Sequence, residues 1–588
     1  MTDKNHTNAK PQLDNEAIVW GSDLIADAIR SLGFKYVTLN PGSSFRGLHD
    51  SLVNHLGNQD PEMVLCLHEE HAVSIAHGWA KVTGQAMAVI LHANVGLMHA
   101  SMAIYNAWCD RVPMVIFGAT GPVAADKRRP WIDWIHTSRD QASIVRSYVK
   151  FDDQPASLKS SLASIMRAHS VANTAPNGPT YVCFDVSVQE EPAPQHVVMP
   201  DPKKYSKPEE QTIKSDVLAT INTLIGQSKR IVFLMGRVSR NAEDWAWRVT
   251  LAESCSASVI TDIKTGATFP TTHAAHVGPP SFFLSNEQKE VLASADLILA
   301  FDWIDVAGAL DQSEATGTLI NISIDHQLAN GWSFDHFAQA PAEINVAVQP
   351  DIVIKELALT RKLSCADLLM AQPLRRVKLA IDGHKPLNME NFPHALEVGL
   401  ANRLTCFVRL PLGWDGSSRD FTHPLDYLGY DGGAGIGSGP GMLIGAALAL
   451  KEGDRLPVAV LGDGDTMMGI SALWTGVRYQ VPFLLVVCNN RSYFNDEVHQ
   501  EKVAVMRDRP IENKSIGQEI TDPDIDFAAL ARAQGLIGLG PVNTVNELVT
   551  ALEDAKVMLD EGRAVLIDAR VNPEYSDTMV QGMTETGS

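Results

Sequence analysis

Two strongly apolar runs near the end of the chain constrain its fold most, because each leads directly into a polar motif. Residues 456–461 precede the sequence GDGD at 462–465, and residues 482–487 precede the sequence CNN at 488–490. Apolar runs of this length are typical of parallel strands that are buried on both faces. The interval between them holds one crossover helix, at about 466–479. Both polar motifs are therefore predicted to emerge at the carboxyl ends of neighbouring strands, where open α/β sheets bind ligands.

The residues of these two motifs suit a complex of Mg²⁺ with a diphosphate. Asp463 offers a carboxylate and Asn490 an amide oxygen, which are hard ligands for an ion that also takes oxygens from phosphate groups. Gly462 and Gly464 allow the backbone to approach the phosphates closely. A single Gly-Asp-Gly is more often an ordinary turn, so the prediction depends on both motifs following strands.

Apolar runs alternate with helical stretches along most of the chain, which predicts an α/β protein with three doubly wound parallel-sheet domains. A segment rich in Pro, Glu and Lys separates the first domain from the second. The predicted order is a flexible tail at 1–15, a first domain at 16–188, a linker at 189–214, a central domain at 215–350, a second linker at 351–385, a third domain at 386–571 and a mobile polar tail at 572–588.

Composition and charge narrow the class of protein. The chain of 588 residues is 45% apolar and 20% charged, as globular proteins are. Its seven cysteines are scattered and odd in number, which argues against a disulfide framework and predicts a cytoplasmic protein. A net charge of −21 disfavours nucleic acid and anionic membrane surfaces as partners. No apolar run approaches the length of a membrane span, and we expect no signal peptide in the polar N-terminal residues.

The paired motifs resemble the signature of thiamine-diphosphate enzymes. The three-domain order resembles the pyrimidine-binding, central and diphosphate-binding domains of their decarboxylase and acetolactate-synthase group. The resemblance implies thiamine diphosphate and Mg²⁺ as cofactors, with Asp463, Asn490 and the backbone carbonyl of Ser492 as metal ligands. Asp465 is unusual beside a diphosphate, and we expect it to contribute its backbone N–H with its carboxylate turned away.

A glutamate of the first domain also fits the resemblance. In the family, a glutamate at a strand-to-helix junction stands at a fixed distance before a Gly, an aromatic residue and an Ala. Glu69 stands at that distance before Gly78, whereas Glu70 does not. The resemblance implies that Glu69 binds the pyrimidine ring of the cofactor and activates it. From the residues alone, both glutamates are also explained as helix N-terminal carboxylates stabilised by the helix dipole, and we expect this of Glu70.

A glycine-rich segment at 432–441 predicts a close approach of the backbone to another group. It resembles the family segment that bends the cofactor around one large apolar side chain. The resemblance implies that Ile436 is this side chain and that the carbonyl of Ala434 binds the 4′-amino group. The alternative is an ordinary loop between a strand and a helix.

The substrate residues are predicted from two strand ends in the first domain. His92 follows a strand, and the sequence Asn-Ala-Trp at 106–108 lies on the next helix, as in benzoylformate decarboxylases. This resemblance implies proton transfer by His92, with a satisfied core histidine as the alternative. Ser43 resembles a serine that binds the substrate carboxylate, and a helix N-cap explains it equally well. Arg46 is a further candidate to neutralise an acid, and we expect no role for His99.

Three further positions in the sequence indicate which cofactor binds and which residues surround the active site. Related decarboxylases carry an acid shortly after the ligand asparagine, which implies a place over the thiazolium ring for Asp496, although a solvated helix start explains it as well. Flavin-containing members carry an arginine after the strand at 297–301, where this chain has Asp302 and Trp303. We therefore do not expect FAD, and we expect Trp303 to cover the active site. No basic cluster marks a coenzyme A site.

Together these features predict an enzyme, dependent on thiamine diphosphate and Mg²⁺, that cleaves or forms a carbon–carbon bond next to a carbonyl. The reaction is decarboxylation of a 2-oxo acid with aldehyde release, or acetolactate-synthase-like carboligation. The alternatives are a cyclic-diketone hydrolase or acyl-CoA lyase with the same cofactor and, in another class, a non-catalytic protein that binds it. Because the sites of this family form between subunits, a homodimer is the minimum assembly and a homotetramer is expected. The sequence leaves the donor and acceptor substrates open.

Overall fold

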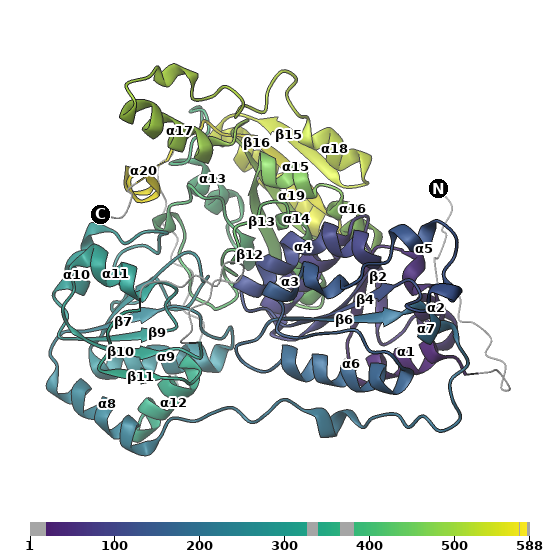
Figure 1. The fold of residues 1–588 in the computed structure, drawn as a ribbon. Coiled ribbons are helices and arrows are strands. Elements are labelled where there is room, and N and C mark those ends of the chain that lie inside the picture. Colours follow the sequence, from purple (N-terminus) through teal and green to yellow (C-terminus); the bar gives the residue numbers. More distant parts are fainter. Residues whose placement is uncertain (1–18, 326–338, 365–381, 576, 585–588) are drawn as a thin grey trace.

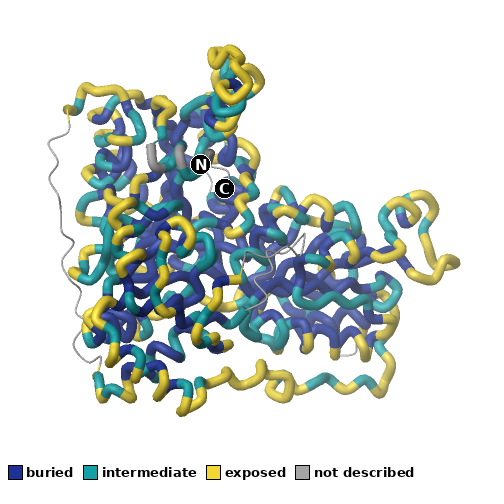
Figure 2. Tube along the Cα trace, turned by 60° about the vertical axis from the view of Figure 1, so that its left-hand side comes forward, coloured by how far each residue is buried: buried dark blue, intermediate teal, exposed yellow. Residues whose placement is uncertain are grey.

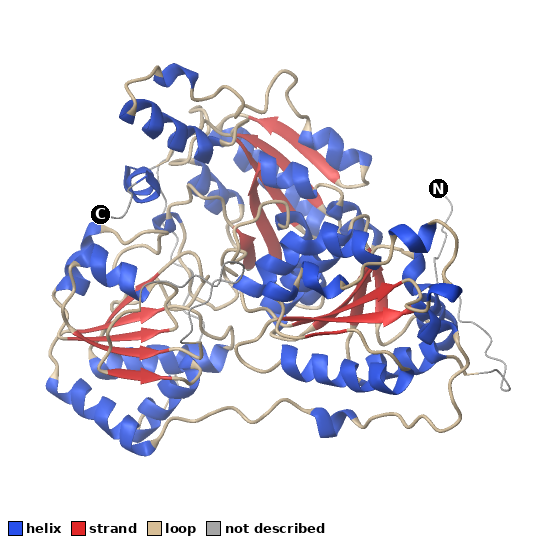
Figure 3. Ribbon diagram, in the orientation of Figure 1, coloured by secondary structure: helices blue, strands red, loops and turns tan. Residues whose placement is uncertain are grey.

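The three parallel α/β sheets predicted from the sequence are present, in the predicted chain order (Figure 1). The structure, a computed structural model, describes residues 19–325, 339–364, 382–575 and 577–584. Helices lie on both faces of each sheet, as Figure 3 shows with the strands in red. Within these described residues, no helix combines the length and the apolar character needed to span a bilayer.

The first sheet is entirely parallel and is packed on both faces. Its strands follow the order β2 (Glu62–Leu65), β1 (Tyr36–Leu39), β3 (Met87–Leu91), β4 (Met114–Thr120), β6 (Pro179–Asp185) and β5 (Asp152–Asp153). One face packs against α1 (Gly21–Ser31) and α6 (Leu158–Ala172), and the other against α3 (Glu69–Thr83) and α4 (Ala93–Cys109). Because successive side chains of a strand point to opposite faces, Ala88 and Ile90 pack on the α1 side and Met87 and Val89 on the α3 side.

The central sheet has the same all-parallel character. Its strands follow the order β11 (Ile344–Val346), β10 (Thr318–Ile322), β9 (Leu297–Phe301), β7 (Ile231–Met235) and β8 (Ser258–Thr261). Its helices are α8 (Ser215–Gln227), α9 (Ala242–Cys255), α10 (Asn286–Ala293), α11 (Val306–Ser313) and α12 (Pro350–Thr360).

Helix α12 corrects the predicted boundary of the central domain. The linker was predicted to begin at residue 351, but Val353, Ile354 and Leu357 are buried in the same core as α9. Their spacing places them on one face of a helix, so the central domain includes α12. The remainder of this predicted linker, 365–381, lies outside the described residues.

The linker between the first two domains runs along the outside of the molecule. It follows α7 (Val186–Glu190), and most residues from 191 to 214 are exposed (Figure 2). Its one short element is the 3₁₀ turn Pro202–Tyr205.

The third sheet carries the two polar motifs. Its strands follow the order β12 (Thr405–Arg409), β13 (Leu456–Gly462), β14 (Leu484–Asn489), β16 (Val565–Arg570) and β15 (Ile537–Val542), all parallel. Its main helices are α13 (Phe392–Gly399), α14 (Gly439–Leu450), α18 (Phe527–Ala533) and α19 (Val545–Asp560). The predicted crossover at 466–479 consists of two short helices, α15 (Asp463–Gly469) and α16 (Ala472–Arg478), and it begins directly at the GDGD motif.

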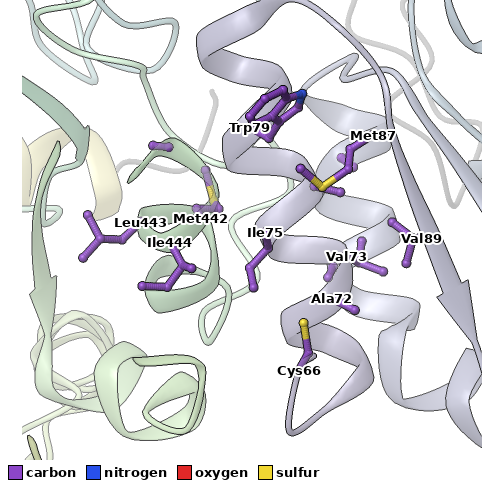
Figure 4. Packing of buried hydrophobic residues seen from close by; sticks show 14 of the residues in the cluster. Cys66, Ala72, Val73, Ile75, Trp79, Met87, Val89, Met442, Leu443 and Ile444 are labelled. Carbon is purple, nitrogen blue, oxygen red and sulfur yellow. The ribbon is translucent and has the colours of Figure 1, made fainter. Parts of the chain in front are cut away.

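Helices α3 and α14 join the first and third domains in one hydrophobic core. Figure 4 shows Ile75 and Trp79 of α3 beside Met442 and Ile444 of α14. The helices approach so closely that a Cβ at Gly445 would lie 1.9 Å from the carbonyl oxygen of Ile75. The relative position of the two domains within one chain is therefore fixed by backbone contact.

We expect Gly445→Ala to lower the free energy of unfolding by about 3 kcal/mol, since the overlap is with backbone that cannot rotate away. Gly226→Ala, in α8, is the matched control, because its Cβ would meet nothing within 4 Å. There the helix propensity of alanine should stabilise the protein by up to about 1 kcal/mol. Differential scanning calorimetry of both variants measures the difference, and equal melting temperatures would contradict this account of the interface.

The C-terminal segment differs from the predicted mobile polar tail. Residues 572–575 line a cavity of the third domain, and α20 (Asp577–Thr584) follows beside α17 (Phe494–Met506). The ring of Tyr575 packs edge-on against that of Phe494, with centroids 4.9 Å apart. This aromatic contact fixes the start of a segment whose other residues are mostly polar.

Candidate active site

A cavity of about 400 Å³ opens in the third domain where β12, β13 and β14 end. The residues predicted to hold the cofactor and its metal all line it: Ala434, Ile436, Gly462, Asp463, Gly464, Asp465, Asn490 and Ser492. They come together because parallel strands bring their carboxyl ends to one edge of the sheet. Their roles stay predictions, but their positions form one site.

Asp463, the first residue of α15, has a buried carboxylate with one unpaired oxygen. Its Oδ1 accepts a hydrogen bond from the Gly464 N–H at 2.8 Å, whereas Oδ2 has no partner among the described residues. Burial raises the pKa of Asp463 to about 6. A buried carboxylate oxygen without a partner is unfavourable unless a cation meets it, so this side chain suits a metal ligand.

Asn490 and Ser492 form a tight turn directly after β14. The Oδ1 of Asn490 accepts a hydrogen bond from the Ser492 N–H at 3.0 Å, and Arg491 between them has a left-handed φ of 59°. β14 pairs with β13 so that Cys488 lies opposite Gly462. This register places the amide of Asn490 at the same end of the sheet as Asp463, which suits two oxygen ligands of one ion.

The two glycines of the motif differ in what surrounds them. At Gly462 a Cβ would meet nothing within 4 Å, so the backbone faces open space on the side of the cavity. At Gly464 a Cβ would lie 2.7 Å from the ring of Tyr493. Gly462 thus leaves room for a phosphate group, and Gly464 is required by packing.

A buried arginine that the sequence analysis did not select stands beside the motif. Arg409, at the end of β12, forms ion pairs with Asp431 and, with 3.5 Å between Nε and Oδ2, with Asp465. Burial alone lowers the pKa of Arg409, but the two carboxylates raise it well above its usual value. The sequence feature that could have identified Arg409 is its position as a charged residue at the end of the apolar run 405–409. The Oδ1 of Asp465 also accepts from the Gly437 N–H at 2.7 Å.

The glycine-rich loop is held by the first domain as well as the third. The amide of Asn106 donates to the carbonyl of Gly435 at 2.9 Å and accepts from the Gly435 N–H at 3.2 Å. On the other side, Asp431 accepts from the N–H of Ala434 at 2.9 Å. These contacts fix the backbone that leads into Ile436, whose side chain reaches the cavity.

Glu69 begins α3 and is buried, and it has a partner that the sequence did not indicate. Its Oε2 lies 3.0 Å from Nδ1 of His99, which we expected to have no role. The ring of His99 stacks on that of His68, with centroids 4.9 Å apart. The adjacent Glu70 is directed elsewhere, and burial first and Asp465 second raise its pKa to about 7. His99 lies one α4 turn beyond Val95, and its contact with Glu69 depends on how α3 and α4 pack.

Ser44, not the predicted Ser43, contacts the predicted catalytic histidine. Ser43 is exposed at the start of a 3₁₀ turn, whereas the buried Oγ of Ser44 lies 2.8 Å from Nδ1 of His92. The other ring nitrogen of His92 lies 3.2 Å from Nδ1 of His136. Burial lowers the pKa of His92 first, and His136 lowers it further. No spacing in the sequence pointed to His136, because it comes from a distant segment.

Arg46 and Trp303 have surroundings different from those expected, and Asp496 lines the cavity. The guanidinium of Arg46 pairs with Glu190 at 2.5 Å, so its charge is already compensated. Trp303 was expected to cover the active site, but it is buried in the core of the central domain because its ring is packed among aliphatic side chains. Asp496 is exposed at the edge of the cavity in the third domain.

Within one chain, the two groups of predicted residues do not share a cavity. The described residues that line the third-domain cavity do not include Glu69, His92 or Ser43. The α3–α14 contact and buried polar pairs such as His71 with Ser471, at 2.8 Å, fix this separation.

Family models match all three domains. The N-terminal thiamine pyrophosphate binding domain of thiamine pyrophosphate enzymes matches residues 19–144, their central domain matches 218–335, and their C-terminal thiamine pyrophosphate binding domain matches 413–569. The chain belongs to this family. It is a thiamine-diphosphate-dependent enzyme, and the third-domain cavity lies within the matched C-terminal binding domain.

Relatives of this thiamine-diphosphate enzyme include both groups predicted from the sequence. It is 26% identical to benzoylformate decarboxylase from Pseudomonas aeruginosa, over 87% of this chain and 92% of the relative. It is 24% identical to acetolactate synthase isozyme 3 large subunit from Escherichia coli, over 94% and 95%. The fold is similar to that of 4-hydroxybenzoylformate decarboxylase from Rhodococcus jostii, with a TM-score of 0.74 and 22% identity over 95% of this chain and 100% of that one.

Proposed function

We propose that this enzyme decarboxylates a 2-oxo acid and releases the corresponding aldehyde. The observation that carries the proposal is the position of Glu69 beside His92. A Cβ built at Gly96 would lie 3.1 Å from Oε1 of Glu69 and 3.2 Å from Cβ of His92. A carboxyl group that activates the cofactor thus stands next to an imidazole that exchanges protons near neutral pH. The likeness to benzoylformate decarboxylase supports the same reaction.

The residues present fit Mg²⁺ and thiamine diphosphate. Asp463, Asn490 and the carbonyl of Ser492 would hold the metal, and the unpaired Oδ2 of Asp463 supports this assignment. The backbone from 462 to 465 would hold the diphosphate, with Ile436 and the carbonyl of Ala434 at the other end. Bound thiamine diphosphate supplies the electron sink that allows the bond to the carboxylate to break. We do not propose FAD, because Asp302 presents a carboxylate where flavin-containing members carry an arginine.

We further propose a homodimer as the active unit, with a homotetramer as the larger assembly. Glu69 of one chain would face the third-domain cavity of the other, and the fixed separation of the two groups within one chain supports this arrangement. We place the enzyme in the cytoplasm. None of the six described cysteines is part of a disulfide bond, which supports a reducing compartment.

Ser43 and His92 would act at the substrate end of the site. Ser43 is exposed near His92, so its hydroxyl is available to bind the carboxylate of a 2-oxo acid. His92 would hold a proton next to the carbon atom that loses CO₂. Carboligation is the second candidate, because acetolactate synthases are also among the relatives.

We expect the purified enzyme, saturated with Mg²⁺ and thiamine diphosphate, to release CO₂ from at least one member of a panel of 2-oxo acids, including benzoylformate and pyruvate. An aldehyde in an amount equal to the CO₂ identifies a decarboxylase. A hydroxyketone in half that amount, or a 2-hydroxy-2-alkyl-3-oxo acid in an amount equal to the CO₂, identifies a carboligase. If CO₂ is not released although the cofactor is bound, decarboxylation is wrong. Cleavage of a cyclic diketone or an acyl-CoA, or a non-catalytic role, would then be tested.

A further inference from the structure

We propose that Arg409 is a positioning residue for the backbone that shapes the cofactor site, and that it acts by holding Asp431 and Asp465. These three side chains are here called the Arg409 clamp, and the backbone that they position is the 434–437 segment. The inference rests on the part of the proposed function that concerns thiamine diphosphate, and it is independent of which substrate reacts.

A carboxylate holds each end of the 434–437 segment. Oδ1 of Asp431 accepts a hydrogen bond from the Ala434 N–H at 2.9 Å, and Oδ1 of Asp465 accepts from the Gly437 N–H at 2.7 Å. Asp431 precedes the segment in the chain, whereas Asp465 belongs to α15. Ile436 therefore lies between two backbone N–H groups that are fixed from different elements.

Arg409 connects the second oxygens of the two carboxylates. Its Nη1 pairs with Oδ2 of Asp431, and its Nε lies 3.5 Å from Oδ2 of Asp465. The guanidinium carbon also lies 4.3 Å from the centre of the Tyr430 ring. A guanidinium can meet two carboxylates at once because its donors form a rigid fork. Each carboxylate thus uses one oxygen for the 434–437 segment and the other for Arg409.

The carboxylates of the clamp depend on the arginine because they are buried. Arg409 is 2% exposed and Asp431 is 0% exposed. Burial raises the pKa of Asp431, Arg409 opposes this rise, and Asp465 adds to it. Burial lowers the pKa of Arg409, but the two carboxylates raise it well above its usual value, so the guanidinium stays charged. Without Arg409, two like charges would share one buried site, which is unfavourable unless one is protonated or moves away.

The 434–437 segment has a backbone conformation that needs such restraint. Ala434 has a φ of 56°, in the left-handed region that residues with a Cβ rarely adopt, and Gly437 has a φ of 109°. A left-handed residue other than glycine persists only where the surrounding structure holds it. Asn106 fixes Gly435 from the first domain. The Arg409 clamp supplies the restraint at the two ends.

The clamp also explains why a carboxylate is present in the GDGD motif. One oxygen of Asp465 accepts from the Gly437 N–H and the other faces Arg409, so the charge of Asp465 is compensated within the protein. The alternative is that Arg409, which lines the cavity, acts on the diphosphate through its charge. In that case Arg409 and Asp465, which have opposite charges, would have opposite effects on cofactor affinity. The clamp predicts effects of the same sign.

The first measurement is amide hydrogen exchange in the full chain without cofactor, by mass spectrometry with fragmentation that resolves single residues. We expect Arg409→Met to speed exchange at both Ala434 and Gly437 by about tenfold or more, since both amides lose a fixed acceptor. Asp465→Ala should speed exchange at Gly437 alone, because Asp431 keeps its arginine and still holds Ala434.

Arg455→Met is the matched control. Nη1 of Arg455 donates to Oδ1 of Asp426 at 2.7 Å, and Oδ2 of Asp426 accepts from the N–H groups of Thr422 and His423 at 2.7 and 2.9 Å. This is a second largely buried arginine–aspartate pair of the third domain, and neither residue lines the cavity. Its loss should speed exchange at Thr422 and His423 and leave the 434–437 segment unchanged.

The second measurement is isothermal titration calorimetry with thiamine diphosphate and, separately, with inorganic diphosphate, each with saturating Mg²⁺. We expect the ratio of the two affinities to fall about tenfold or more in both Arg409→Met and Asp465→Ala, because a segment that is not held must be ordered when the cofactor binds. In Arg455→Met the ratio should stay within about twofold of wild type, as for a distant, independent site.

Two results would overturn the clamp. One is a folded Arg409→Met protein in which Ala434 and Gly437 exchange at the wild-type rate. The other is an unchanged affinity ratio, with both ligands bound more weakly by Arg409→Met and more tightly by Asp465→Ala, which would show that the two residues act through charge on the diphosphate.

If Arg409→Met does not fold, Arg409→Lys takes its place. Lysine keeps the charge but lacks the fork, so it should remain paired with Asp431 and release Asp465. Exchange should then speed up at Gly437 while Ala434 stays protected, and wild-type exchange at Gly437 would contradict the clamp. Neither measurement uses a substrate, so both results stand apart from whether a 2-oxo acid is decarboxylated.

Discussion

Glu69→Gln is expected to abolish nearly all turnover while the enzyme still binds Mg²⁺ and thiamine diphosphate. The side chain keeps its size, but an amide cannot exchange the proton that activates the pyrimidine ring, and a loss of about 10²- to 10⁴-fold in kcat is typical for such a group. If the proposed diphosphate and metal contacts of the third domain supply most of the cofactor affinity, that affinity should change little. Steady-state CO₂ release and isothermal titration calorimetry measure the two quantities separately.

Glu70→Gln is the matched comparison, because it makes the same change one residue later in α3. Burial and Asp465 raise the pKa of Glu70 to about 7, so a glutamine imitates the neutral carboxyl that is present below that pH. We expect this variant to keep most of its activity at pH 6. Equal losses in both variants would mean that the helix start, not a specific acid, supports turnover. Full activity in Glu69→Gln would show that this glutamate does not activate the cofactor.

The third-domain half of the site was predictable from the sequence because its signal is local. Each polar motif directly follows an apolar run, and such runs identify β13 and β14 without any knowledge of tertiary contacts. Once the strands are parallel, Asp463 and Asn490 must emerge at the same edge of the sheet. The α/β class and the three-sheet order follow from the same alternation along the chain.

The first-domain half was predicted less completely, because its contacts depend on side-chain direction. Ser43 and Ser44 are adjacent in one short turn, and only the folded backbone decides which hydroxyl reaches His92. His99 reaches Glu69 through the packing of α4 on α3. His136 arrives from a separate segment with no motif of its own. A pattern in the sequence fixes which residues share an element, but not which side chains meet across elements.

The same limit explains the two errors in the domain boundaries. Helix α12 was taken for linker because its apolar positions occupy a single short helix without a following strand. Tyr575 was assigned to the mobile tail because a single aromatic residue in a polar segment forms no periodic apolar pattern. Its ring contact with Phe494 nevertheless places residues 572–575 along the cavity. The C-terminal residues of the chain thereby become part of the same site as the GDGD motif.

Asp463→Asn is expected to weaken the binding of Mg²⁺ and thiamine diphosphate by about 100-fold or more, since loss of outer partners of a metal ligand already reduces affinity about 10- to 100-fold. The effect of this substitution on the free energy of unfolding should have opposite signs without and with bound cofactor. Without cofactor the variant should be the more stable protein, because it removes a buried carboxylate whose Oδ2 has no described partner. With cofactor at a hundred times the wild type's dissociation constant, binding stabilises the wild type by about 3 kcal/mol and a variant with 100-fold weaker binding by less than about 1 kcal/mol, so the wild type should become the more stable protein.

Asp568→Asn provides the control for this reversal. Asp568 of β16 is also buried with an unpaired Oδ2, and burial raises its pKa, but it does not line the cavity. Its substitution should change stability equally with and without cofactor and leave the affinity for Mg²⁺ and thiamine diphosphate unchanged. Melting temperatures of the three proteins in both conditions measure this difference. If Asp463→Asn binds the cofactor as tightly as the wild type, the metal is not held at this end of β13. If both variants lose affinity equally, the unpaired oxygen of Asp463 reflects burial alone and is no sign of a cation.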